Sequence, residues 1–78
     1  MKNRLTIYAK LLKDNLTGKG CDFIMQRAEP VSNSIVMQFR HNNISQSIIG
    51  KCLDPLKCIY RMEYGKDIVT LLLQIQGE

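Results

Sequence analysis

The chain has 78 residues, of which 45% are hydrophobic and 23% are charged, and its formal net charge is +4. This length leaves room for one domain with one modest core, so we predict a single small domain over residues 1–78. The composition is close to the globular average, and the longest apolar run is far shorter than a membrane span. These features exclude a transmembrane chain and predict a soluble protein without a membrane partner.

Residues 1–16 fit two periodicities. As a helix, the segment places an apolar stripe within an arc of about 100°, opposite Lys10 and Lys13, and leaves Ile7 and Leu11 as misfits. As a strand, its alternation is equally good. The run is longer than a usual strand, and Gly18 stands where a helix would stop. We therefore predict a helix and keep a strand as the alternative.

A hairpin with a long loop is predicted next, over residues 21–27 and 34–41. Apolar residues alternate with polar or β-branched ones in both runs, and Pro30 lies in the loop between them. The next pair, Asn43 and Gln46, has the spacing of a capping box, which predicts a short helix. This helix should end at Asp54-Pro55. Its predicted apolar stripe is Ile44, Ile48, Ile49, Cys52 and Leu53.

The C-terminal part predicts a second hairpin, formed by residues 58–64 and 68–76 with a turn at Gly65-Lys66-Asp67. In the last strand Val69, Leu71, Leu73 and Ile75 fall at period two, which indicates one apolar face. The predicted fold is α+β, a four-stranded antiparallel sheet with two helices on one face in the order αββαββ. The alternative for the first segment gives βββαββ. A faint repeat of the αββ unit suggests two-fold pseudosymmetry.

The two faces of this sheet are predicted to differ. We expect the helices to cover a face that carries Phe23, Met25, Met37, Phe39, Tyr60, Met62, Leu71 and Leu73. The other face would then carry Ile24, Val36, Ile59, Ile68 and Leu72 among Gln26, Gln38, Arg40, Arg61, Thr70 and Gln74. So many apolar residues are unusual for a solvated sheet surface, which indicates that something covers this face. The alternatives are scattered surface hydrophobic residues, which are normal, or an N-terminal segment that packs there as a fifth strand.

Catalytic, metal and cofactor signatures are not found in the sequence. Cys21, Cys52 and Cys58 form neither an even disulfide framework nor a close ligand pair, and His41 cannot complete a usual zinc set at this spacing. Each cysteine fits an apolar stripe, where a thiol would be inert. We therefore predict no enzyme activity, no cofactor, no bound metal, no disulfide and a cytoplasmic location.

Two functions remain, from different classes. The first is a non-enzymatic binding protein, such as an inhibitor, regulator or assembly factor, that works by protein–protein contact and forms a homodimer. Its predicted interface residues are Ile24, Val36, Ile59, Leu72, Arg40 and Arg61. The alternative is a nucleic-acid-binding regulator whose basic N-terminal segment contacts phosphates. The residues predicted for that role are Lys2, Arg4, Lys10, Lys13 and Lys19.

Overall fold

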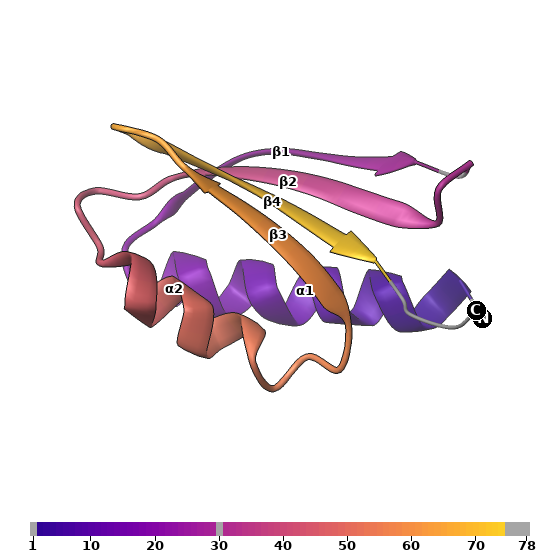
Figure 1. Cartoon of the computed structure of the whole chain (residues 1–78). Coiled ribbons are helices and arrows are strands. Elements are labelled where there is room, and N and C mark those ends of the chain that lie inside the picture. The colour runs from indigo at the N-terminus through magenta and orange to yellow at the C-terminus, as the bar shows by residue number, and fades with distance from the viewer. Residues whose placement is uncertain (1, 30, 75–78) are drawn as a thin grey trace.

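The computed structural model describes residues 2–29 and 31–74, and its elements follow the order αββαββ. These elements are α1 (Lys2–Gly18), β1 (Asp22–Glu29), β2 (Ser34–Arg40), α2 (Gln46–Leu53), β3 (Ile59–Tyr64) and β4 (Ile68–Gln74). Figure 1 shows both helices on one side of the sheet, with the other side uncovered. The α+β prediction is confirmed, and the strand alternative for the first segment is wrong. Neither described helix combines the length and hydropathy needed to cross a membrane.

The four strands are all antiparallel and lie in the order β1-β2-β4-β3. The second strand of each αββ unit is therefore central, and the first strand of each unit is at an edge. Along the central pair Met37 lies opposite Leu71, with Ile35 opposite Leu73 on one side and Phe39 opposite Val69 on the other. The strand order stays the same when the two αββ units are exchanged.

The helix α1 packs one stripe against the sheet and leaves the opposite stripe in solvent. Its buried residues are Leu5, Ala9, Leu12 and Leu16. Ile7 and Leu11, which do not fit the predicted stripe, are 55% and 53% exposed. Helical spacing explains both groups, because residues three or four apart share a face.

The core lies between the helices and the central strands. The fully buried strand residues are Met37, Phe39, Val69, Leu71 and Leu73. Ile49, Cys52 and Leu53 of α2 are buried against the same core. The predicted period-two face of the last strand is thus confirmed for its described part, and Ile75 lies outside the described residues.

The start of α2 differs from the prediction. Ser45, not Asn43, is the N-cap residue, and its hydroxyl accepts a hydrogen bond from the backbone N–H of Ile48 at 3.3 Å. Asn43 has a φ of 64°, which places it in a turn ahead of the helix. Ile44 consequently precedes α2, and Ile48 is 40% exposed rather than part of the buried stripe.

A β-bulge in β1 overturns two predicted side-chain directions. Phe23 pairs with Phe39 while Met25 pairs with Gln38, so Ile24 is an extra residue without a partner on β2. A bulge shifts the alternation of every later residue in its strand. Met25 therefore lies on the uncovered face with Gln38, and Gln26 lies on the helix side opposite Met37. The sequence predicted the reverse for both residues.

Candidate protein-binding face

The uncovered side of the sheet, which we call the open face, is built from cross-strand rows. Read from β1 to β3, these rows are Glu29–Ser34–Gln74–Ile59, Arg27–Val36–Leu72–Arg61 and Met25–Gln38–Thr70–Glu63. A shorter row, Asp22–Arg40–Ile68, follows. No described helix or loop is packed on these rows in Figure 1. Apart from Ser34, which is 5% exposed, the side chains on these rows are therefore available to a partner.

The centre of the open face is half apolar. Val36 lies opposite Leu72, and both are half-buried by their neighbours on the sheet alone. In the next row Gln38 Nε2 donates a hydrogen bond to Thr70 Oγ1 at 3.2 Å. Because the two side chains already hydrogen-bond to each other, burying them under a partner would cost less free energy than burying two unpaired polar groups.

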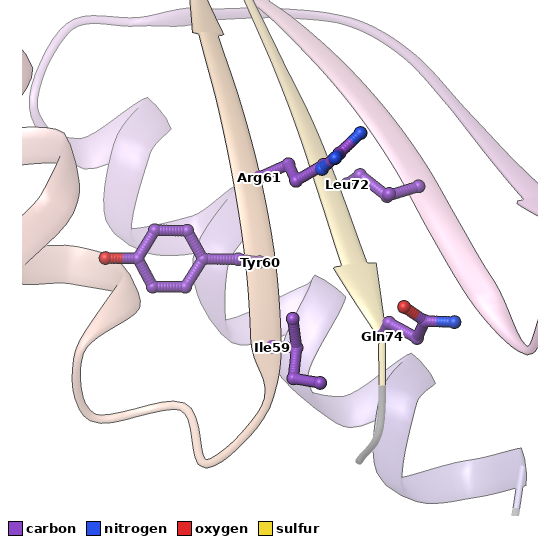
Figure 2. A pocket seen from close by; sticks show the side chains of 5 residues that line it. All are labelled: Ile59, Tyr60, Arg61, Leu72 and Gln74. Atoms are coloured by element: carbon purple, nitrogen blue, oxygen red, sulfur yellow. The ribbon is translucent and has the colours of Figure 1, made fainter.

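A shallow hollow of about 270 Å³ lies beside this centre. It is lined by Ile59, Tyr60, Arg61, Leu72 and Gln74. In Figure 2 Arg61 reaches from β3 across to Leu72 on β4, while the ring of Tyr60 points away from the other four residues. The hollow thus combines aliphatic side chains with one guanidinium group, which can bind a carboxylate through two parallel hydrogen bonds.

The charges of the open face are only partly satisfied within the chain. On β1, Arg27 Nε lies 2.7 Å from Glu29 Oε2. Within the described part of the chain, no ion pair involves Arg40, Arg61 or Glu63. All three of these side chains are exposed. Charged groups of both signs are therefore free to meet complementary groups on a partner.

Five of the six predicted interface residues meet on this one face. Val36, Leu72 and Arg61 share a row, Ile59 lies in the adjoining row at 43% exposure, and Arg40 lies beside Ile68. Ile24 is 42% exposed, but as the extra residue of the bulge it has no place in the rows. Among the members of the face that sequence reasoning missed are Met25, Arg27 and Glu63. Met25 and Arg27 were missed because a bulge cannot be read from alternation alone.

The residues predicted for nucleic-acid contact are spread along α1 rather than gathered. Arg4 and Lys19 lie near its two ends, about 22 Å apart at the rise of a helix. Lys10 Nζ is 3.3 Å from Asp14 Oδ2, and Lys13 Nζ lies 4.2 Å from the centre of the Phe23 ring. The side chain of Lys2 lies outside the described residues. Arg4, Lys10 and Lys13 thus already have partners within the chain.

His41 is a structural residue rather than a surface one. It is 2% exposed, its ring stacks on Tyr64 at 4.3 Å between centres, and its Nε2 lies 2.8 Å from the carbonyl oxygen of Gly65. A carbonyl only accepts, so Nε2 carries the proton and donates, which leaves Nδ1 to accept the backbone N–H of Asn43 at 3.2 Å. Both ring nitrogens thus bond His41 to loop backbone.

The cysteines carry free thiols, and two of the three, Cys21 and Cys52, are buried. Burial raises the pKa of the Cys21 thiol, and the charges of Cys52 and Asp22 add to the effect. Burial also raises the pKa of the Cys58 thiol, against a hydrogen bond from the Gln74 backbone that lowers it. Such thiols are poor nucleophiles, because the thiolate is the reactive form. Among the described residues no three His, Cys, Asp or Glu side chains converge as metal ligands would.

Comparisons of the chain with protein-family models, with curated proteins and with solved structures found no match.

Proposed function

We propose that this chain is a small, non-enzymatic cytosolic protein that works through protein–protein contact, as an inhibitor, regulator or assembly factor, and that it forms a homodimer through the open face. The observation that carries the proposal is the row Arg27–Val36–Leu72–Arg61, in which two aliphatic side chains lie at the middle of an uncovered sheet and two arginines flank them. An apolar centre with a polar rim is the usual anatomy of a protein interface. Three unpaired thiols support a reducing compartment.

Self-association would also stabilise so short a chain, because it buries additional surface. A domain of this size buries only about 60% of the surface that its unfolded chain exposes, and covering a second face adds to that fraction. Most homo-oligomers are two-fold dimers that use the same patch on both subunits. The open face can serve in this way because it carries aliphatic groups, arginines and a free carboxylate together.

The nucleic-acid alternative has less support. Proteins that bind single strands stack bases on exposed aromatic rings, but the open face carries no aromatic side chain in any of its described rows. The α1 cations Lys10 and Lys13 are engaged inside the chain. A mobility-shift titration against mixed DNA and RNA at low salt should show no binding. Binding that weakens steeply with salt would favour this alternative instead.

The homodimer is tested by sedimentation velocity with a matched pair of substitutions. The wild-type chain should sediment as a dimer at about 100 μM. This high concentration is needed because small interfaces are weak. Leu72→Asp places a charge at the centre of the open face and should give a monomer. Leu11→Asp makes the same change at a 53% exposed position of α1, on the other side of the molecule, and should leave the dimer intact.

Three results would contradict this proposal. A strict wild-type monomer at about 100 μM would remove the homodimer, and a dimer that persists in Leu72→Asp would remove the open face as its interface. Dissociation by Leu11→Asp alone would move the interface to α1. Far-ultraviolet circular dichroism of each variant verifies that the fold is retained.

A further inference from the structure

We propose that the two copies dock with their strands running in opposite directions, about a two-fold axis that crosses the strands, so that Arg61 of each copy meets Glu63 of the other. This inference rests on the proposed homodimer and adds its geometry and its charge contacts.

The edge strand β3 carries charges of both signs on the open face. Arg61 and Glu63 are two residues apart on the open side of this edge strand, so their α-carbons are about 6.6 Å apart. Both side chains are exposed, and neither belongs to an ion pair within the described residues. A cation and an anion without partners thus stand next to each other along one strand, which is a self-complementary pattern for a reversed second copy.

A two-fold axis determines which rows of the two copies meet. Arg61 belongs to the row of Val36 and Leu72, and Glu63 belongs to the next row, with Gln38 and Thr70. Consider a two-fold axis that crosses the strands midway between these two rows. It lays the Val36–Leu72 row of each copy over the Gln38–Thr70 row of the other copy. Arg61 then lies against Glu63 of the second copy, and by symmetry the same contact forms twice.

The same operation places the central side chains acceptably. Leu72 lies against Thr70 of the second copy, where it contacts the threonine methyl group. Val36 lies against Gln38, whose amide is already bonded to Thr70 within its own chain at 3.2 Å. At the β1 edge Arg27, held by Glu29 at 2.7 Å, lies over Met25, a flexible side chain that adapts to irregular surfaces.

The other simple way to pack the two faces is electrostatically unfavourable. A two-fold axis along the strands keeps each row in place and lays β1 of one copy over β3 of the other. Arg27 and Arg61 occupy the two ends of one row, so this axis brings them against each other in both halves of the dimer. Like charges in contact across an interface suppress a docking mode. The axis across the strands has one such contact, Glu29 over Asp22 at the β1 edge, and there Arg27 lies 2.7 Å from Glu29 and offsets its charge. The charge pattern therefore favours the axis across the strands.

The size of the face sets the expected strength. Four strands about 4.8 Å apart and rows of about 3.3 Å per residue give a flat area of order 400–500 Å² per copy. Two copies would thus bury about 800–1,000 Å² in total, which is less than the roughly 1,200–2,000 Å² of stable interfaces. We therefore expect a weak dimer, for which the two ion pairs should matter.

The test exchanges the charges one at a time and then together, by sedimentation velocity at about 100 μM with native mass spectrometry. Arg61→Glu carries two glutamates on β3 and should dimerise at least tenfold more weakly than the wild type. Glu63→Arg carries two arginines there and should be weakened equally. An equimolar mixture of the two variants should form a heterodimer, because each supplies the charge that the other lacks. The double variant Arg61→Glu/Glu63→Arg should regain the homodimer.

The outcomes separate this inference from the homodimer itself. If Leu72→Asp abolishes the dimer but the mixture of single variants stays monomeric, the open face is the interface and the proposed axis is wrong. If both single variants dimerise like the wild type, the Arg61–Glu63 contact is also wrong. A wild-type chain that is strictly monomeric at the same concentration overturns the homodimer and this geometry together.

Discussion

Leu71 and Leu72 are neighbours on β4, yet they belong to two different environments. Leu71 is fully buried between the sheet and the helices, whereas Leu72 is half-buried at the centre of the open face. The covered face is uniformly apolar along the central strands, with Met37, Phe39 and Val69 completely buried beside Leu71. The open face instead alternates aliphatic groups with arginine, glutamate, glutamine and threonine.

This difference separates folding from binding. A uniformly apolar face gains free energy by excluding water, and it fixes which side the helices cover. A mixed face can remain in water when the chain is alone and still be buried when a partner supplies complementary groups. We therefore expect substitutions on the covered face to change stability, and substitutions on the open face to change association.

The largest effect should come from truncating the two neighbouring leucines. Leu71→Ala leaves a cavity in the core and should lower the free energy of unfolding by about 2–5 kcal/mol. Leu72→Ala should cost less than about 1.5 kcal/mol, because water already reaches this side chain. Urea unfolding at about 1 μM protein makes the comparison in the monomer, where association does not contribute. Equal losses would mean that the open face is covered within the chain.

The second effect concerns the turn that sets the register of β3 on β4. A Cβ atom at Gly65 would lie 2.8 Å from the backbone oxygen of Ile68, so Gly65→Ala must displace backbone and should cost about 1–3 kcal/mol. Gly50→Ala is the matched control, because a Cβ there meets nothing within 4 Å. Because alanine favours a helix more than glycine does, Gly50→Ala in α2 should raise the free energy of unfolding by about 0.5–1 kcal/mol. Thermal denaturation of both variants checks the pair, and a neutral Gly65→Ala would contradict the turn geometry.

A smaller effect should appear on raising the pH, because Cys21 and Cys58 lie against the covered core. The fold raises the pKa of both thiols, chiefly through burial. Below the unfolded thiol pKa of about 8.5 both states hold the proton and the thiols do not affect stability. Above it the unfolded chain loses protons first, so the free energy of unfolding should fall as the pH rises.

The control for this pH effect is the double variant Cys21→Ala/Cys58→Ala. Its urea midpoint should fall less than that of the wild type between about pH 7.5 and pH 10. Lysine and tyrosine titrations are common to both chains, so the difference isolates the two thiols. Parallel curves for the two chains would contradict burial as the cause of the raised pKa values.

The smallest effect should come from Thr70→Val on the open face. The change removes the acceptor of the Gln38 hydrogen bond but keeps a β-branched side chain, so stability should stay within about 1 kcal/mol. In the proposed dimer the variant also leaves the Gln38 amide unpaired against Val36 of the second copy, so the dimer should weaken by about two- to fourfold. Sedimentation equilibrium measures this change, and a dimer as tight as the wild type would contradict burial of the Gln38–Thr70 pair at the interface.

Much of this fold could be predicted from local pattern. The period-two apolar residues of β2 and β4 identify the buried side of both central strands, because alternation allows only one set of residues to face the core. The same alternation places Val36, Ile59, Arg61 and Leu72 on the opposite side, so most of the candidate site was also predictable. Helical spacing likewise identified Ile7 and Leu11 as residues that do not fit the core.

What the sequence alone determined is thus the set of elements, their order and the buried side of each regular strand, since these depend on neighbours in the chain. Only the tertiary structure decided the rest. The bulge at Ile24 becomes visible when β1 is paired with β2, and it reverses Met25 and Gln26. The burial of His41 depends on Gly65, 24 residues away. The rows of the open face depend on the strand order β1-β2-β4-β3, because cross-strand neighbours are set by long-range hydrogen bonding and not by sequence periodicity.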